Sequence, residues 1–278
     1  MTFTPIPKLI GRCVALLCAL LFSVAAVADR LDKIKERGSL ICATLIANEP
    51  LGFADPESRK IVGFDVDMCG ALAKQMGLTL EHQGISVEAR VPELVLGRVD
   101  VVSAAFGYTK ERAEQVEFTS SHYQTPIRLI VPVDGGLEKV EDLAGKKISA
   151  IKGSTLELFA RRALPTATVL TFQDAPTAFL ALSQGKVQAM SQTQTGGIRY
   201  VNETGGKFKF AQGSLAWEPT ALGVKKGEQA LLDAINGALG KLEEGGTIDA
   251  LWSKWYGPAT KYNIVREKKL TPISAFKS

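Results

Sequence analysis

Two short segments of the sequence contain residue types that can bind an anion. Residues 152–155, Lys-Gly-Ser-Thr, join an expected strand to an expected helix, where free backbone N–H groups and the helix dipole can hold a carboxylate or a phosphate. A serine that only caps the helix would give the same pattern. Residues 107–112 follow another expected strand, and the Arg112 guanidinium can bind a carboxylate through two parallel hydrogen bonds, although a lone loop arginine is commonly solvated. The presence of two such loops favours one shared anion between them.

Both segments belong to a chain in which expected strands and helices alternate. Short apolar runs predict strands, and runs with an apolar period near 3.6 residues predict helices. The alternation predicts an α/β fold with parallel sheets covered by helices on both faces. Asp65 is the expected N-cap of one helix. The expected strands span residues 40–44, 78–82, 99–104, 147–151, 168–172 and 187–191, and the expected helices span 31–37, 65–76, 91–96, 155–164, 175–183, 228–242 and 247–255.

An internal similarity suggests that this alternation occurs twice. Residues 94–100 and 182–188 each end a helix, continue with Gly97 or Gly185, then a basic residue and a valine, and enter a strand. Ser103 and Ser191 fall in register with each other. Chance similarity is the alternative, because turns from helix to strand often use glycine. Duplication predicts two similar lobes, with the loops after both strands facing each other across a cleft, where open α/β sheets bind ligands.

The first 28 residues have the features of a secretory signal peptide. Lys8 and Arg12 precede an apolar run over residues 13–27, and the segment ends in Ala-Val-Ala. An uncleaved membrane anchor is the alternative, but the run is shorter than the roughly 20 residues that span a bilayer. Neither Cys13 nor Cys18 follows the small residues of a lipoprotein acceptor site. We therefore expect an exported, soluble protein, located in the periplasm.

Composition and charge exclude several classes of function. The formal net charge is +4, of which Lys8 and Arg12 carry two, and aromatic residues make up only 7% of the chain. This balance gives no electrostatic footprint for nucleic acid. The chain has no nucleophile-elbow, phosphate-loop or dinucleotide-binding motif. Its two histidines, His82 and His122, lack metal-ligand spacing to any cysteine. We expect no metal, no cofactor and no catalytic residue.

Two cysteines, Cys42 and Cys69, remain after the expected signal peptide. In an oxidising compartment they could form a disulfide, or they could stay as two buried thiols that pack like small apolar residues. Cys42 lies on an expected strand and Cys69 on the helix that follows it. Because a strand and its following helix pack together, the disulfide is the favoured interpretation.

Five motifs occur in order over nearly the whole expected mature chain. They are IVGFDVD at 61–67, TKER at 109–112 followed by Phe118-Thr119, KGST at 152–155, QGKV at 184–187 and IDALWSKWYG at 248–257. With these motifs the sequence resembles the periplasmic polar-amino-acid-binding proteins, the family 3 extracellular solute-binding proteins that serve as receptors of ABC importers. The position of the two cysteines is also similar to that in a subgroup of these receptors in which they pair.

The resemblance implies an α/β periplasmic-binding-protein-like fold, in which two lobes close over the ligand around a hinge with two crossings. The implied organisation is a signal peptide at 1–28, lobe one at 29–126, lobe two at 127–221 and a return segment of lobe one at 222–278. It also implies two partners, which are a small-molecule ligand (an amino acid or related carboxylate) and an ABC permease in the inner membrane. We expect a monomer.

The resemblance also assigns roles to individual residues. Arg112 matches the arginine that clamps the ligand's α-carboxylate, with help from backbone N–H groups at Gly107 and Thr155. Phe64 matches an aromatic residue that lies against the body of the ligand. Arg90 matches a position that contacts the side-chain carboxylate in receptors for aspartate and glutamate; its alternative is a structural ion pair. The complete set of expected ligand-binding residues is Asn48, Phe64, Arg90, Gly107, Thr109, Arg112, Ser154, Thr155 and Thr193.

The sequence departs from the family pattern at two of these positions. Thr193 stands where the family usually has an aspartate that binds the ligand's α-ammonium group, and losing that carboxylate removes a bond worth about 1.5–3 kcal/mol. Asn48 stands where an aromatic side chain commonly stacks on the ligand. Glu49 is a candidate for the missing negative charge.

Two classes of function follow. The first is a receptor that delivers a polar amino acid, expected to be acidic, or a related carboxylate to a permease. The second is a periplasmic enzyme on the same fold, similar to the cyclohexadienyl dehydratases, whose substrate need not be a free amino acid. No acid–base pair is evident for the enzyme, so the receptor is favoured.

Overall fold

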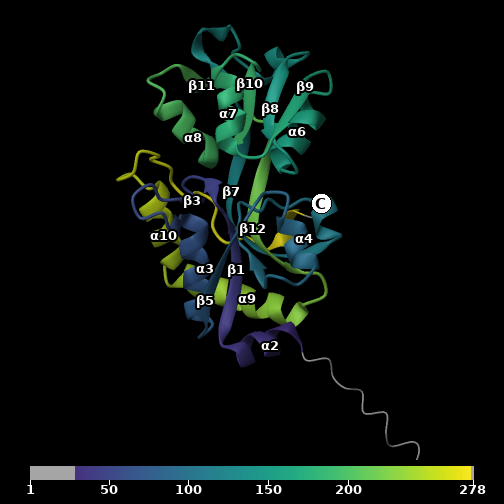
Figure 1. Ribbon diagram of the computed structural model, residues 1–278, viewed down its shortest axis with the longest axis vertical. Helices are drawn as coiled ribbons and strands as arrows, with labels where there is room; N and C mark the ends of the chain where they lie inside the picture. Colours follow the sequence, from purple (N-terminus) through teal and green to yellow (C-terminus); the bar gives the residue numbers. More distant parts are fainter. Residues whose placement is uncertain (1–28, 277–278) are drawn as a thin grey trace, which may run out of the picture.

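The computed structural model describes residues 29–276, which form two lobes joined by two long strands (Figure 1). The expected signal peptide lies outside the described residues. The lower lobe in Figure 1 holds strands β1 (Ser39–Leu45), β5 (Thr79–Ile85) and β6 (Val101–Val102). Its helices are α2 (Arg30–Arg37), α3 (Phe64–Gln75), α4 (Arg90–Val95), α5 (Lys110–Ala113), α9 (Gln229–Glu244) and α10 (Thr247–Tyr256), and a small separate sheet contains β2 (Ala47–Asn48), β3 (Gly52–Ala54) and β4 (Ile61–Val62).

The upper lobe is built from the middle of the chain. Its strands are β8 (Lys147–Ile151), β9 (Thr168–Phe172), β10 (Ala189–Thr193) and β11 (Phe208–Phe210), and its helices are α6 (Thr155–Ala163), α7 (Ala175–Ser183) and α8 (Gln194–Asn202). Short 3₁₀ turns occupy Val133–Gly135 and Val140–Leu143, and a third, Ile273–Phe276, ends the described chain. Both lobes contain α/β units, so the expected fold class is confirmed.

The two crossings are β7 (Val116–Pro132) and β12 (Ala216–Lys225), which pair with each other in antiparallel fashion. They make one sheet continuous through both lobes, in the order β5-β1-β6-β12-β7-β10-β8-β9, with β11 on β7. The predicted lobe boundaries after residues 126 and 221 fall inside these strands, and that division stays a prediction.

The expectation of purely parallel sheets is wrong at the centre of the sheet. The outer pairs β1–β5, β1–β6, β8–β9 and β8–β10 are parallel, whereas β6–β12, β12–β7 and β7–β10 are antiparallel. The crossing strands contain many polar residues in their middle, so they lack the apolar alternation by which strands are recognised. The strand expected over 99–104 is also shorter, because the chain turns into a loop after Val102.

The two turns that suggested a duplication have the same geometry. Gly97 and Gly185 adopt φ of 67° and 69°, in the left-handed region that glycine populates without strain. Each donates its N–H at 2.9 Å to the carbonyl three residues earlier, on Leu94 and Leu182 respectively. Matching turns therefore end a helix and lead toward a strand in each lobe.

The lobes have separate hydrophobic cores. In the lower lobe, α3, α9 and α10 pack around buried residues such as Phe64, Met68, Leu72, Leu239 and Trp252. In the upper lobe, α6, α7 and α8 cover the sheet through buried residues that include Ile130, Leu156, Val169, Ala178 and Met190. Each lobe is stabilised by removing its own apolar side chains from water. The surface between the lobes can therefore carry polar groups.

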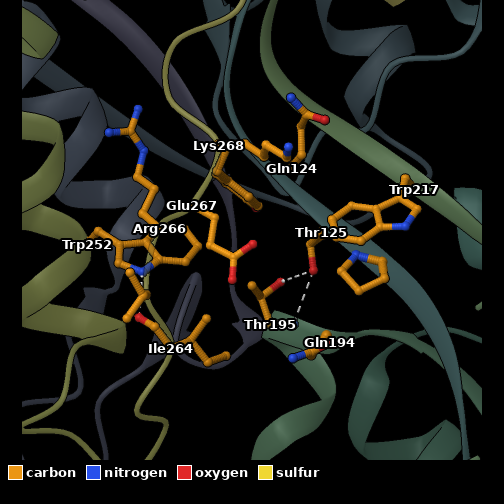
Figure 2. A pocket seen from close by; sticks show the side chains of 13 residues that line it. Gln124, Thr125, Gln194, Thr195, Trp217, Trp252, Ile264, Arg266, Glu267 and Lys268 are labelled. Carbon is orange, nitrogen blue, oxygen red and sulfur yellow. Dashed lines mark hydrogen bonds between the residues drawn. The ribbon is translucent and has the colours of Figure 1, made fainter. Parts of the chain in front are cut away.

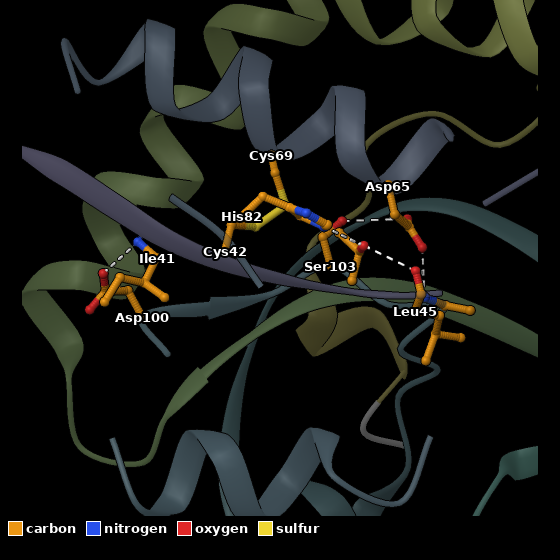
Figure 3. Close-up of a disulfide and its surroundings, with 10 residues drawn as sticks. Ile41, Cys42, Leu45, Asp65, Cys69, His82, Asp100 and Ser103 are labelled. Carbon is orange, nitrogen blue, oxygen red and sulfur yellow. Dashed lines mark hydrogen bonds between the residues drawn. A yellow bond between two sulfur atoms is a disulfide. The ribbon is translucent and has the colours of Figure 1, made fainter. Parts of the chain in front are cut away.

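A disulfide joins Cys42 on β1 to Cys69 on α3, as expected (Figure 3). Both residues are fully buried in the lower lobe. The bond joins two residues that are 27 positions apart in the sequence, and it fixes α3 against β1, whose C-terminal end reaches the cleft.

Candidate ligand-binding cleft

A small polar cavity lies between the two lobes, at the carboxyl ends of the parallel strands. Its volume is about 30 Å³, which is room for about two water molecules. The inner cavity alone is therefore too small for an amino acid. The residues that line the cavity are Leu45, Asn48, Val87, Arg90, Ala105, Ile151, Ser154, Thr155, Leu156, Gln192, Thr193 and Glu218.

A second, mostly apolar pocket of about 170 Å³ adjoins this cavity. The two share Leu45, Asn48, Val87 and Ile151. Together they form one cleft with a polar inner end and an apolar mouth, in which a ligand's charged groups and its body would meet different surroundings.

Arg112 links the two lobes near the inner end of the cleft. Its Nη1 donates to the Gly107 carbonyl at 2.6 Å, and its Nη2 donates across the cleft to the Gly153 carbonyl at 3.1 Å. The guanidinium also lies over the Phe106 ring, 5.2 Å from its centroid. Burial lowers the pKa of Arg112 from its usual value, yet within residues 29–276 no carboxylate oxygen comes within 4.0 Å of its guanidinium nitrogens.

Arg90 lines the cavity and supports the loop that follows β6. It is 3% exposed, and it donates from Nε to the Val87 carbonyl at 2.9 Å and from Nη1 to the carbonyls of Ala104 and Ala105 at 3.1 and 2.8 Å. No ion pair to Arg90 exists among the described residues, so the structural ion pair considered as its alternative role is absent from them. Its charge is surrounded by these backbone carbonyls and by the Phe106 ring, whose centroid is 5.3 Å from the guanidinium carbon. The negative charges of Glu218 and Asp65 act on it from beyond ion-pair distance.

Asp65 holds the same loop from the other side. The expected N-cap role of Asp65 is wrong, because α3 begins one residue earlier, at Phe64, and is preceded by Gly63. The Asp65 carboxylate instead accepts from the Ala105 N–H at 2.9 Å and from the Ser103 hydroxyl at 3.4 Å (Figure 3 shows Asp65 beside Ser103). Burial raises its pKa to about 7, against the effect of these hydrogen bonds.

Glu218, on β12, contributes a carboxylate to the cavity. It is 3% exposed, and its Oε2 accepts a hydrogen bond from the Thr155 hydroxyl at the start of α6. Burial raises the pKa of Glu218, while Thr155, Arg112 and Arg90 act in the opposite direction. The carboxyl group lies directly over Gly107, where an added Cβ would fall 2.2 Å from Oε2.

Three further polar residues meet at the inner end. Thr193 caps α8, because its hydroxyl accepts from the Gly196 N–H at 3.1 Å. The Gln192 Oε1 accepts from the Thr193 N–H at 2.9 Å, which turns the Gln192 amide nitrogen the other way. That nitrogen and the Asn48 Oδ1 are buried and have no hydrogen-bond partner among the described residues. A buried donor and a buried acceptor without partners are costly, and a bound ligand would satisfy both.

The helix start at Ser154 has the geometry of an ordinary N-cap as well as facing the cavity. Its hydroxyl accepts from the Glu157 N–H at 3.3 Å. The N-cap interpretation made from the sequence is therefore confirmed. The start of α6 also lines the cavity, and its binding of an anion stays a prediction.

The structure does not bring every expected site residue to the cavity. Phe64 is fully buried in the lower core, where it packs against His122, Tyr123, Trp252 and Tyr256. The role expected for Phe64 against the ligand's body therefore does not fit its position, because the first turn of α3 points this ring away from the cleft. Thr109 caps α5 by accepting from the Arg112 N–H at 3.2 Å, and so it positions Arg112 from outside the cavity lining.

Glu49 is not available as the missing negative charge. Its carboxylate already accepts hydrogen bonds from Arg199 at 2.7 Å, from Lys261 at 2.9 Å and from the Tyr262 hydroxyl at 2.8 Å. These hydrogen bonds and charges lower its pKa, although desolvation alone, the largest single influence, would raise it.

Ion pairs join the rims of the cleft. Glu88 pairs with Lys152 at 3.0 Å and Glu111 with Arg162 at 2.6 Å, each pair with one partner on either lobe. These pairs are solvent-exposed, so each contributes little energy in itself. They show that the facing rims carry complementary charges.

Sequence reasoning missed Glu218 and Gln192. Glu218 lies on a strand that was not predicted, and its one signal was an acidic residue in an otherwise uncharged run from Trp217 to Val224. Gln192 directly precedes Thr193, so its signal was proximity to a position already singled out.

Another pocket, of about 170 Å³, lies beside the crossing strands (Figure 2). It is formed by β7, the start of α8 and the tail segment 264–268, and Thr125 and Thr195 share a hydrogen bond in it. It contains none of the expected ligand-binding residues, and we call it the rear pocket.

Two negative findings apply to residues 29–276. No group of three or more His, Cys, Asp or Glu side chains is placed to hold a metal ion. No helix within this range is both long and apolar enough to cross a membrane.

The fold and the cleft define a two-lobed solute-binding protein. The chain belongs to the bacterial extracellular solute-binding proteins, family 3, whose family model matches residues 40–258. A curated relative is the ABC transporter glutamine-binding protein GlnH of Bacillus subtilis, 29% identical over 232 residues, covering 82% of this chain and 84% of the relative.

Solved structures agree with this assignment. A receptor for L-cysteine from Neisseria gonorrhoeae has a TM-score of 0.79 and 27% identity, covering 86% of this chain and 98% of that one. An ancestral amino-acid-binding protein, described as a precursor of cyclohexadienyl dehydratase, has a TM-score of 0.75 and 29% identity, covering 81% of this chain and 98% of that one.

Proposed function

We propose that this protein is a periplasmic receptor of an ABC importer that binds an acidic amino acid and delivers it to a membrane permease. The observation that carries the proposal is the charge of the cleft. Arg90 lines the inner cavity and Arg112 lies beside it, and neither has a carboxylate within ion-pair distance among the described residues. Glu218 is the one carboxylate that lines the inner cavity, and Asp174 lines the apolar mouth. At the inner end, Arg90, Arg112 and Glu218 leave one net positive charge, which complements the single net negative charge of aspartate or glutamate.

The protein's relatives support the receptor class. GlnH is named as a glutamine-binding protein of an ABC transporter, and the receptor from Neisseria gonorrhoeae is named for L-cysteine. These ligands share an α-carboxylate and an α-ammonium group and differ in their side chains. We infer the same common groups for the ligand of this chain, and we infer its acidic side chain from the charge of the cleft.

Thermal unfolding against a ligand panel tests the proposal. The panel contains aspartate, glutamate, glutamine, arginine, leucine and the deaminated acids succinate and glutarate. A ligand at 100 times its dissociation constant adds about 2.7 kcal/mol, or a rise in Tm of about 5–10 °C for a chain of this size. The expected result is a rise with aspartate or glutamate. A larger rise with leucine would contradict the acidic ligand and indicate that the apolar mouth sets specificity.

A dehydratase is the second candidate function. Glu218 is a buried carboxyl group with a raised pKa, which is a property of general acids. Incubation with arogenate or prephenate, followed by the absorbance of the aromatic product, separates the two functions. The receptor predicts no product above the uncatalysed rate.

A further inference from the structure

The position that usually supplies an acidic partner for the ligand's ammonium group carries no charge in this protein. The Thr193 hydroxyl is already used to cap α8 through the Gly196 N–H. Glu49, the nearest acidic residue to Asn48 in the sequence, is held by Arg199, Lys261 and Tyr262 outside the cavity. An α-ammonium group that enters the cleft must therefore find its negative partner elsewhere.

Glu218 is placed to be that partner. It reaches the cavity from β12, which crosses between the lobes, while Thr193 lies at the end of β10 in the upper lobe. Both residues line the same cavity, so a carboxylate from either direction could reach one bound group. The negative charge is thus present in the cleft but comes from a different strand.

The surroundings of Glu218 hold its carboxyl group in a fixed place. The Thr155 hydroxyl donates to Oε2 from the start of α6. Gly107 leaves the space that the carboxyl group occupies, because a Cβ there would fall 2.2 Å from Oε2 and 2.3 Å from Cδ. Within the described residues, Oε1 receives no hydrogen bond. One oxygen therefore orients the group and the other can accept from a ligand.

We propose that Glu218 binds the α-ammonium group of the ligand and replaces the carboxylate that the Thr193 position lacks. This inference rests on the proposed function, because it requires the ligand to be an amino acid. The Asn48 Oδ1, which is buried without a partner, is a second acceptor on the same cavity wall. The ligand's carboxylates are then left to Arg112, Arg90 and the start of α6.

The test compares each amino acid with the same acid lacking its amino group. The pairs are L-aspartate with succinate, L-glutamate with glutarate, and L-leucine with 4-methylpentanoate, measured by isothermal titration calorimetry. For the pair that binds the wild-type protein, Glu218→Gln is expected to weaken the amino acid by about 10- to 100-fold, the equivalent of one charged hydrogen bond. The deaminated acid should change less than threefold.

Two further variants make the test specific. Glu218→Gln combined with Thr193→Asp returns a carboxylate from the other strand, and it should recover at least tenfold of the lost affinity. Glu117→Gln, which removes a carboxylate that pairs with Lys226 away from the cleft, is the matched control and should leave both affinities unchanged.

The outcomes distinguish failure of the role inferred for Glu218 from failure of the proposed receptor function. A wild-type protein that binds no amino acid contradicts the proposed function, and the inference falls with it. Equal weakening of both members of a pair by Glu218→Gln would show that Glu218 only positions Thr155, and would overturn the inference alone. Tighter binding of both members would also overturn it, because Glu218 would then compete with the ligand's own carboxylate.

Discussion

The arginines of the cleft and the arginine of the rear pocket have different kinds of partner. Arg266, which lines the rear pocket, binds Glu243 at 2.6 Å, Asp249 at 2.7 Å and the His122 carbonyl at 2.8 Å. Arg112 and Arg90 in the cleft donate hydrogen bonds to backbone carbonyls only, and both guanidinium groups lie over the Phe106 ring. The positive charge of Arg266 is therefore paired with carboxylates of the protein itself, whereas the positive charges of Arg112 and Arg90 remain unpaired and can pair with a ligand.

This difference teaches that two pockets of similar volume can have different chemistry. The rear pocket and the apolar mouth of the cleft each have a volume of about 170 Å³, yet the buried guanidinium in the rear pocket is already paired. The cleft combines unpaired positive charge, a buried carboxylate and two buried polar atoms without partners. A charged ligand gains more from the second environment.

The largest expected effects concern two buried titratable groups, one on each side of this comparison. On the cleft side, burial raises the pKa of Asp65 to about 7. Between pH 4 and pH 7 the folded protein keeps a proton that the unfolded chain releases, so stability falls as the pH rises through this window, by about 4 kcal/mol at about 1.4 kcal/mol per unit. Denaturant unfolding at pH 4, 5.5 and 7 should show this fall in the wild type relative to Asp65→Asn, and parallel curves would contradict it.

Near the rear pocket, His122 should change the stability with pH in the opposite direction to Asp65. Burial and the charge of Arg266 lower the pKa of His122 to about 3. Between pH 3 and pH 6.5 the unfolded chain binds a proton that the folded protein does not, so stability is complete above pH 6.5 and is lost toward pH 3. His122→Phe should therefore gain stability relative to the wild type on acidification. A constant difference between the two proteins across this range would refute the buried neutral histidine.

Arg266→Ala should separate stability from binding. Removing it takes away the hydrogen bonds of this buried guanidinium to Glu243, Asp249 and the His122 carbonyl, although Asp249 keeps its pair with Lys269. We expect the free energy of unfolding to fall by about 3 kcal/mol. Ligand affinity at a temperature where the variant is folded should stay within twofold. Chemical denaturation and calorimetry on the same sample measure both quantities, and a large loss of affinity would show that the rear pocket takes part in binding.

Arg112→Ala should show the opposite pattern. We expect affinity for the ligand to fall by about 100-fold, or about 2.8 kcal/mol, because a charged clamp and a link between the lobes are removed together. The free energy of unfolding should change by less than about 1 kcal/mol, because the side chain lies at the cleft and not in either core. Arg112→Lys keeps the charge but not the planar donor pair and should recover only part of the affinity.

Trp217→Ala should have the smallest effect. Trp217 lines the rear pocket and is 55% exposed. Affinity should change by less than twofold, and stability by about 0.5 kcal/mol or less, as is usual for a surface substitution. A tenfold loss of affinity would reverse the assignment of the two pockets.

The local features of the fold were largely predictable from the sequence. The disulfide of Cys42 and Cys69 followed from a strand and its neighbouring helix, and Gly97 and Gly185 marked matching turns. The crossing strands were not predictable, because β12 is buried on both faces and β7 is polar in its middle, so neither has a two-residue apolar period.

The site was predictable where a loop follows a recognisable strand or opens a recognisable helix. Asn48, Arg90, Ser154, Thr155 and Thr193 all line the cavity, and their contacts with a ligand remain a prediction. Phe64 was misplaced because a motif shows that a helix begins but not which way its first side chain points. Glu218 was missed because only the three-dimensional pairing of β12 with β7 brings it to the cleft.

The antiparallel ribbon of β7 and β12 has a mechanical consequence. The two strands are paired from Val116–Lys225 to Ile127–Ala216, and the pairing shifts register at Thr220, Ala221 and Gly223. A paired ribbon resists stretching and in-plane shear but bends across its thin direction, most easily where an irregularity interrupts the ladder. Glu218 lies two residues before Thr220, where the first register shift begins. A bend at this irregularity would therefore move the Glu218 carboxylate relative to the lower lobe, and the position of the negative charge in the cleft would change with the angle of the ribbon.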